Sequence, residues 1–197
     1  MFSQIRLQFQ KFPVMINKFA FSTFILSIFL LHTGCNEIDK LKDTLLDVTL
    51  QQEFVVVTDT STFVGIELLG PTSNKDFNDN KDKISNLELS RITYQIISLD
   101  TSEGAATKLT HGDIKFERFD GTNRTALAQM HDVDLKSAFI SNIETQVNLE
   151  AGAADKLTQV FSTAPYKVRV IYAAEANQPT ANFRILFRYK LRLKSKL

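Results

Sequence analysis

The sequence contains little cysteine, proline or glycine. Cys35 is the only cysteine among 197 residues, so no disulfide can form within the chain. A protein without disulfides must be stabilised by packing alone. The four prolines and seven glycines form no long linker, and no internal repeat is present. The sequence therefore indicates one folded domain.

The common signatures of catalysis are also missing. The sequence contains no Gly-x-Ser-x-Gly nucleophile elbow and no glycine-rich phosphate loop. No second cysteine is available for thiol chemistry. These absences favour a protein that is not an enzyme.

The most informative segment is an apolar run over residues 19–31, which leads into Thr33, Gly34 and Cys35. A membrane-spanning helix needs about 20 apolar residues, whereas the hydrophobic part of a signal peptide takes about 7 to 15. Three basic residues and no acidic residue precede the run. Its length and its charge are therefore typical of a signal peptide.

Together these features resemble the signal peptide and lipobox of bacterial lipoproteins. In that family the cysteine is joined to a diacylglyceryl group, the leader is cut off before it, and an N-acyl chain is added. The resemblance implies that residues 1–34 are a signal peptide, that Cys35 carries the lipid and that residues 35–43 form a tether. Met15 also fits as the initiating residue. An ordinary signal peptide and an uncleaved anchor are the alternatives.

The resemblance also implies where the protein is located. Several acyl chains would hold it on a membrane permanently, because each buried methylene contributes about 0.8 kcal/mol. Asn36 follows the cysteine, where an aspartate would resemble the inner-membrane retention signal of enteric bacteria. We therefore expect an exported protein that is anchored in the Gram-negative envelope, at the outer membrane. The leaflet that it occupies is left open.

The mature chain is close to neutral. The leader holds three of the 23 basic residues and none of the 22 acidic ones, so the mature net charge is 20 minus 22, or −2. A nucleic-acid partner is not expected for such a body. Residues 44–197 are predicted to form a single domain.

Alternating apolar residues predict strands, because side chains in a strand point to opposite faces in turn. The predicted strands cover residues 46–56, 64–68, 92–96, 114–116, 126–130, 168–172 and 183–193. A change of phase between Leu89 and Ile92 predicts a bulge near Ser90. Asp120 and Gly121 predict a hairpin. Seven or eight such strands predict a mainly β fold: an antiparallel β-sandwich of immunoglobulin-like or Greek-key type, with a partly open barrel as the alternative.

One short helix is predicted near residues 151–162, where apolar residues have helical spacing and Pro165 follows. The segment 139–149 fits a strand or a helix equally well. The polar segment 74–83 is predicted to be a loop.

That polar segment offers a calcium hypothesis. Oxygen-bearing side chains occupy alternate positions as in a calcium loop: Asp76, Asn78, Asn80 and Asp82. A lysine stands where the sharp-turn glycine of such a loop belongs. A calcium-dependent carbohydrate-binding module is therefore one alternative function, and a solvated loop is the other interpretation.

The last predicted strand carries a basic stripe on its outward face: Arg184, Arg188, Lys190, Arg192 and Lys194. Such a stripe could bind anionic lipid headgroups, lipopolysaccharide phosphates or an acidic glycan. The other interpretation is an edge strand that its charges protect from pairing with other chains.

His111 and His131 are the histidines of the mature chain. A zinc site needs three or four convergent ligands, so no metal site is predicted from two histidines. His111 is expected in a surface turn.

Carboxylates occur in two sequence pairs, Asp132 with Asp134 and Glu117 with Asp120. Glycoside hydrolysis needs two carboxylates that face each other across a cleft. A hydrolase of envelope polysaccharide is therefore a second alternative. The leading hypothesis is a non-catalytic lipoprotein that binds an envelope protein, a glycan or another lipoprotein.

Overall fold

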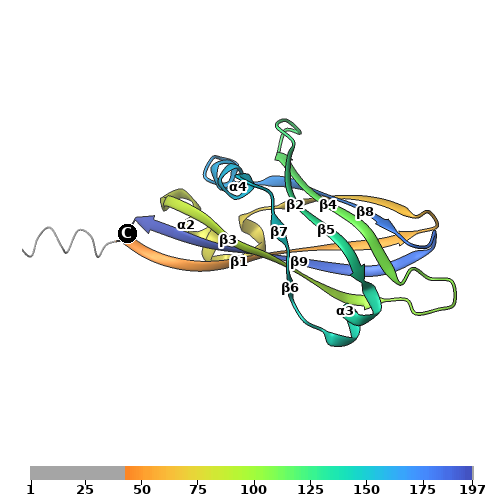
Figure 1. Cartoon of the computed structure of the whole chain (residues 1–197). Helices are drawn as coiled ribbons and strands as arrows, with labels where there is room; N and C mark the ends of the chain where they lie inside the picture. The colour runs from red at the N-terminus through yellow and green to blue at the C-terminus, as the bar shows by residue number, and fades with distance from the viewer. Residues whose placement is uncertain (1–42, 197) are drawn as a thin grey trace, which may run out of the picture. The chain divides into compact units, whose positions relative to one another are not determined.

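Two antiparallel sheets form the domain, shown in Figure 1 from a computed structural model that describes residues 43–196. The first sheet has the strand order β1 (Asp43–Thr58), β9 (Ala181–Lys196), β3 (Ile84–Leu99) and β6 (Thr145–Gln146). The second has the order β2 (Thr62–Leu69), β8 (Val168–Ala176), β4 (Lys108–Arg118), β5 (Thr125–Asp134) and β7 (Asn148–Leu149).

The strand pairs are nested along the chain. β4 pairs with β5, β3 with β6, β2 with β8 and β1 with β9, all antiparallel. This nesting is the order of a jelly roll, which consists of two Greek keys. The predicted antiparallel β-sandwich is therefore confirmed, in its Greek-key form. The structure describes more strands than were predicted. The additional ones are β6 and β7, which are only two residues long and therefore too short to show an alternating pattern.

Helices close the end of the sandwich where the first sheet is longer than the second. β1, β3 and β9 have 16 residues each, whereas β4, the longest strand of the second sheet, has 11. The helices α2 (Lys75–Asn80) and α4 (Ala153–Phe161) cover this extension. Phe77 of α2 meets Phe161 of α4 edge to face at 6.0 Å, and both side chains are fully buried. The helix predicted near 151–162 is thus confirmed as α4.

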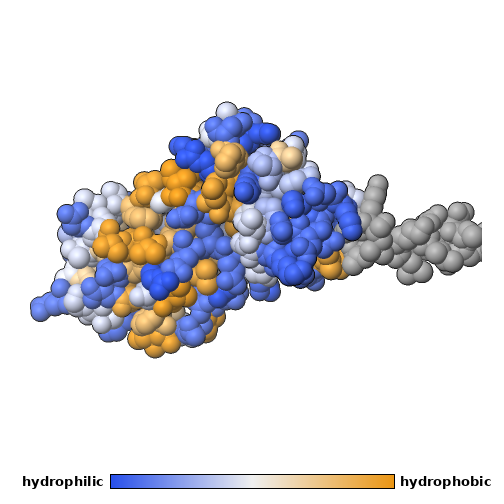
Figure 2. All heavy atoms as spheres, turned by 180° about the vertical axis from the view of Figure 1, so that it is seen from behind, coloured by the Kyte–Doolittle hydropathy of each residue, from blue (hydrophilic) through white to orange (hydrophobic). Residues whose placement is uncertain are grey.

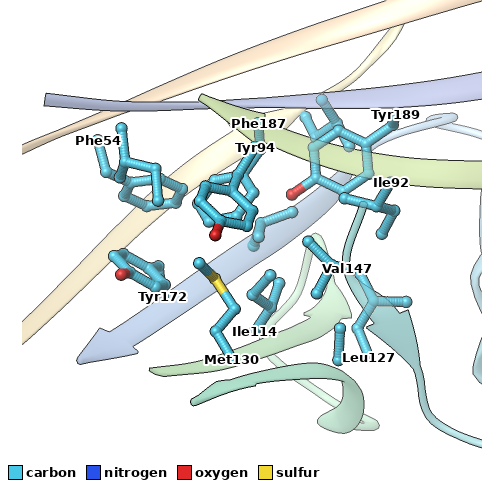
Figure 3. Packing of buried hydrophobic residues seen from close by; sticks show 14 of the residues in the cluster. Phe54, Ile92, Tyr94, Ile114, Leu127, Met130, Val147, Tyr172, Phe187 and Tyr189 are labelled. Atoms are coloured by element: carbon cyan, nitrogen blue, oxygen red, sulfur yellow. The ribbon is translucent and has the colours of Figure 1, made fainter. Parts of the chain in front are cut away.

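The core lies between the sheets and follows the predicted alternation. Six alternate residues of β9 are at most 1% exposed: Phe183, Ile185, Phe187, Tyr189, Leu191 and Leu193. Figure 3 shows Phe54, Tyr172 and Phe187 packed together, with Tyr172 and Phe187 ring centroids 5.3 Å apart. Each large apolar side chain buried in this way contributes about 1.5–3 kcal/mol.

The bulge near Ser90 is confirmed. The pairing of β3 with β9 shifts by one residue between Leu89 and Arg91. The Ser90 hydroxyl donates a hydrogen bond to the carbonyl oxygen of Lys190 at 2.8 Å. The shift explains how Leu89 and Ile92, on opposite phases of the sequence, both reach the core.

The connections differ in part from their predictions. The hairpin at Asp120 and Gly121 joins β4 to β5 as expected, but its loop covers residues 119–124. Gly121 adopts a φ of +83°, which favours glycine. The ambiguous segment 139–149 contains the end of the helix α3 (Leu135–Ser141) and then β6 and β7. The predicted loop 74–83 is instead helical, formed by α2 and the 3₁₀ turn η2 (Lys81–Lys83), after the 3₁₀ turn η1 (Pro71–Ser73).

Candidate functional site

The predicted lipidation site, Cys35, lies outside the described residues, and so does the apolar run before it. In residues 43–196 no helix has the length and hydropathy needed to cross a bilayer. The folded unit begins at Asp43, where the predicted tether ends.

The basic stripe lies on the outward face of β9, but β9 is not an edge strand. It pairs with β1 on one side and with β3 on the other, so the edge-protection interpretation is wrong. Arg184 forms an ion pair with Glu53 of β1, and Arg192 lies 3.2 Å from Asp47 of the same strand. Lys194 also has an interaction with a neighbouring group.

Glu144 pairs with the other two cations of the stripe. Its carboxylate lies 3.3 Å from Arg188 and 3.5 Å from Lys190. The hydroxyl of Thr93 donates a hydrogen bond to the same carboxylate at 2.9 Å. This hydrogen bond, followed by the charges of Arg188 and Lys190, holds the pKa of Glu144 below its ordinary value. The stripe is therefore a set of ion pairs across strands, and its positive charge is partly compensated.

The calcium candidates lie on a helix. Residues two apart on an α-helix point about 200° away from each other, so Asp76 and Asn78 face different directions. The side chain of Asn78 accepts a hydrogen bond from Lys81 at 3.3 Å, and that of Asn80 donates to the carbonyl oxygen of Asp76 at 2.8 Å. Asp82 lies in η2. This geometry does not give the convergent oxygen ligands that the calcium hypothesis requires.

Three of the four candidate acids are exposed and hold local structure. Asp134 accepts a hydrogen bond from the backbone N–H of Ser137 and caps α3, which lowers its pKa. The hydrogen bond from Lys108 lowers the pKa of Asp132, and the hydroxyl of Thr122 lowers that of Asp120. A general acid needs a raised pKa, so these shifts have the opposite sign to that role.

Glu117, the fourth acid, is 1% exposed although it lies on the outward phase of β4. Its carboxylate accepts a hydrogen bond from Nε of Arg124 at 3.0 Å and lies 3.2 Å from Arg169. A buried carboxylate held between two guanidinium groups is a structural ion pair. It does not face Asp120 as a catalytic partner would, because Asp120 is turned to Thr122.

An apolar surface that the sequence did not reveal lies along β2. Val64, Ile66 and Leu68 are 65%, 46% and 56% exposed. Their alternation in the sequence predicts that they form the buried face of a strand, but the structure exposes all three, so this prediction is wrong. Phe63 packs against the core and Leu69 is fully buried, so the opposite phase of β2 faces inward.

Gly65 explains the misleading pattern. It stands on the inward phase, where a Cβ atom would lie 2.8 Å from both Phe54 and Phe63. Because the aromatic rings fill this space, the inward phase of β2 needs no large residue there. The regular apolar alternation in this part of the sequence therefore comes from the outward residues Val64, Ile66 and Leu68, and it resembles the pattern of a buried face.

Val55 and Val57 of β1 are 56% and 69% exposed as well, but they lie on the outer face of the first sheet, where Val55 pairs with Arg184, whereas the exposed residues of β2 lie on the outer face of the second sheet. We call Val64, Ile66 and Leu68 the β2 edge surface. Figure 2 shows hydrophobic side chains gathered on the side of the sandwich seen from behind. A shallow hollow of about 560 Å³ borders the surface, and its lining includes Ile66, Leu68, Phe119 and Arg169.

The strands β1 and β2 are edges of their sheets. Within residues 43–196, β1 pairs only with β9, and β2 pairs only with β8. Lysine, proline or a short length usually protects an edge strand from pairing with strands of other chains. β1 and β2 contain no lysine, arginine or proline and are 16 and 8 residues long. The opposite edges, β6 and β7, are two residues long. In β2, exposed apolar side chains thus coincide with an edge strand that has no lysine, arginine or proline.

Comparisons with known proteins yield only distant similarities. No family model and no curated protein matches the chain. Among solved structures, a chain of tobacco necrosis virus is 11% identical, with a TM-score of 0.40 over 79% of this chain and 84% of that one. A chain of Cocksfoot mottle virus is 10% identical, with a TM-score of 0.40 over 78% and 97%. A chain of Desmodium yellow mottle tymovirus is 11% identical, with a TM-score of 0.33 over 78% and 90%. Similarities of this extent do not bear on function.

Proposed function

We propose that this chain is a lipid-anchored lipoprotein of the Gram-negative envelope whose sandwich domain binds a partner protein through the β2 edge surface. The observation that carries the binding role is the exposure of Val64, Ile66 and Leu68 on an edge strand that contains no lysine, arginine or proline. Exposed apolar patches of this kind mark interaction sites in soluble domains.

A protein partner fits this surface better than a lipid or a sugar. Edge strands offer unpaired backbone N–H and C=O groups, and an added strand of a partner can pair with them. The exposed aliphatic side chains at alternate positions would then provide specificity. Anionic lipid headgroups attract lysine and arginine, which are absent from β1 and β2. The charged residue of β2 is Glu67, which adds no attraction for such lipids.

The anchor supports the binding role by location. A lipid on Cys35 would leave the short segment 36–42 between the membrane and the domain. The unit would then be held within reach of other envelope proteins. Calcium-dependent sugar binding and polysaccharide hydrolysis stay hypotheses from the sequence, and no contact in the described residues favours either.

Labelled palmitate tests the anchor. Cells that produce the native protein should incorporate the label into it, and Cys35→Ala should abolish incorporation and leave the uncut precursor. Mass measurement of the mature native protein should place its first residue at Cys35. A free thiol at Cys35, or a different first residue, would contradict the lipoprotein assignment.

Site-specific photo-crosslinking in intact envelopes tests the binding surface. A benzophenone side chain at Ile66 should capture one reproducible protein, whereas the same group at the exposed Gln159 of α4 should not. Ile66→Thr combined with Leu68→Thr should abolish co-purification of that protein, because threonine keeps β propensity but removes the apolar contact. Crosslinks only to lipid at Ile66, or equal capture at both positions, would overturn the proposal.

A further inference from the structure

His111 and His131 lie side by side on the outer face of the second sheet. They occupy paired positions of β4 and β5, although they are distant in the sequence. Their ring centroids are 4.9 Å apart, and their Nδ1 atoms are 3.3 Å apart. His111 lies in a strand, so its predicted position in a turn is wrong. The His111 side chain is 39% exposed and His131 is exposed, so solvent reaches both rings.

Asp113 determines which nitrogen of His111 is available. Its Oδ1 atom lies 3.1 Å from Nε2 of His111, and its Oδ2 atom accepts a hydrogen bond from Lys115 at 3.0 Å. An ionised carboxylate only accepts hydrogen bonds. Nε2 of neutral His111 therefore carries the proton, and Nδ1 keeps its lone pair.

The distance between the two Nδ1 atoms matches a tetrahedral cation. Zinc binds histidine nitrogen at about 2.0–2.1 Å, so two such ligands of a tetrahedral site lie about 3.3–3.4 Å apart. The Nδ1 atoms of His111 and His131 are already at 3.3 Å, in a hydrogen bond that His131 donates when Nδ1 of His111 keeps its lone pair. Zinc binding requires that this proton move to Nε2 of His131 or to solvent. A carboxylate on the far nitrogen of the ring is also the usual partner of a zinc-bound histidine, because it fixes the ring and makes it more basic. Asp113 occupies that place for His111.

We propose that His111 and His131 form a zinc-binding site through their Nδ1 atoms, with Asp113 as a positioning residue for His111. Both rings need to turn outward so that their lone pairs converge on the cation. The described residues hold no group of three or more His, Cys, Asp and Glu side chains that could bind a metal. Glu175 of β8 is paired with His111 on the side away from His131. Water or a side chain of a partner protein therefore completes the coordination.

Titration of the purified full-length protein with zinc chloride, followed by calorimetry, tests the site. We expect one zinc ion per chain for the native protein. His131→Gln should lower the affinity at least tenfold, and His111→Gln should do the same. Zinc should also shift the imidazole NMR signals of both residues, whereas magnesium should shift neither. No zinc binding, or equal binding by the His111→Gln and His131→Gln double variant, would overturn the proposal.

A pair of carboxylate variants tests the positioning role. Asp113→Asn should weaken zinc binding by about tenfold, since loss of such a partner typically costs 10–100-fold in metal affinity. It should also change the NMR signals of the His111 ring in the absence of metal. Asp59→Asn, an exposed change of the same chemistry, should leave affinity unchanged. Equal zinc affinities for Asp113→Asn and Asp59→Asn would show that Asp113 does not position His111 for zinc binding. Because His131 is exposed, His131→Gln should keep the fold even if His111→Gln does not.

Discussion

Arg169 of β8 lies 3.2 Å from the carboxylate of Glu117 on β4, and the Glu117 side chain is only 2% exposed. Arg124, from the loop between β4 and β5, lies 3.0 Å from the other carboxylate oxygen. The two guanidinium groups are themselves partly open to solvent, at 36% and 60% exposure. The buried negative charge is therefore compensated from the surface, and each cation replaces part of the hydration that Glu117 loses on folding.

Removal of one of these cations should destabilise the domain. Arg169→Gln leaves a buried carboxylate with a single charged partner, and we expect a loss of about 1–3 kcal/mol in the free energy of unfolding. Urea denaturation measures it. Arg184→Gln is the matched control, because its partner Glu53 is 32% exposed and such pairs contribute at most about 1 kcal/mol. Equal losses in the two variants would mean that burial of Glu117 has no energetic consequence.

Glu144 should contribute to stability in a pH-dependent way. The Thr93 hydroxyl, Arg188 and Lys190 lower its pKa below the ordinary value of 4.5. Since the folded pKa is lower than the unfolded one, this contribution is present above about pH 4.5 and is lost as the pH falls through the folded pKa. Urea midpoints at about pH 6 and about pH 3 should therefore differ less for Glu144→Gln than for the native protein. The control variant Glu103→Gln, at an exposed position, should show the same difference between the two urea midpoints as the native protein. A reduced difference in this control would contradict the role given to Glu144.

The buried tyrosines should respond to loss of their hydroxyl groups in opposite ways. The hydroxyl of Tyr172 has no hydrogen-bond partner among the described residues, whereas that of Tyr189 lies 3.3 Å from the side-chain oxygen of Gln52. Tyr172→Phe should leave stability unchanged or raise it by about 1 kcal/mol, because an unpaired buried hydroxyl is costly. Tyr189→Phe should lower it by about 0.5–1.5 kcal/mol. Thermal unfolding of both variants measures the difference, and the reverse order would contradict this description of the core.

The two strand glycines offer another matched pair. A Cβ atom at Gly65 would lie 2.8 Å from Phe54 and Phe63, whereas one at Gly112 would lie 3.4 Å from the nearest atom, Cβ of Met130. Gly65→Ala should therefore cost about 1–3 kcal/mol through overpacking. Gly112→Ala should cost clearly less. Chemical denaturation compares them, and equal costs would show that the rings beside Gly65 can move aside freely.

Local sequence patterns predicted the elements that depend on local physics. The alternation from Phe183 to Leu193 predicted a strand with one buried face, and that face is buried throughout. The helical spacing from Ala154 to Phe161 predicted α4. The phase change around Ser90 predicted the bulge. In each case the periodicity of the backbone determines which neighbouring residues share a face, and a short stretch of sequence contains that information.

Features that depend on strand order were not predictable in this way. The basic residues of β9 suggested an edge, yet β9 is central, and acids from β1 and the segment before β6 compensate them. The pattern of β2 predicts the wrong phase because Gly65 occupies an inward position, where the rings of Phe54 and Phe63 fill the space. His111 and His131 have no shared sequence motif, and only the antiparallel register of β4 and β5 brings them together.

The sequence by itself determined a β-rich domain, the short helix α4 and the resemblance of its first 35 residues to a lipoprotein leader, because these are properties of consecutive residues. Tertiary structure alone decided which strands became edges, which face of β2 met the solvent and which charges were paired. Those outcomes depend on contacts between residues far apart in the chain, and the nested pairing of a jelly roll places the two ends of the domain, β1 and β9, side by side.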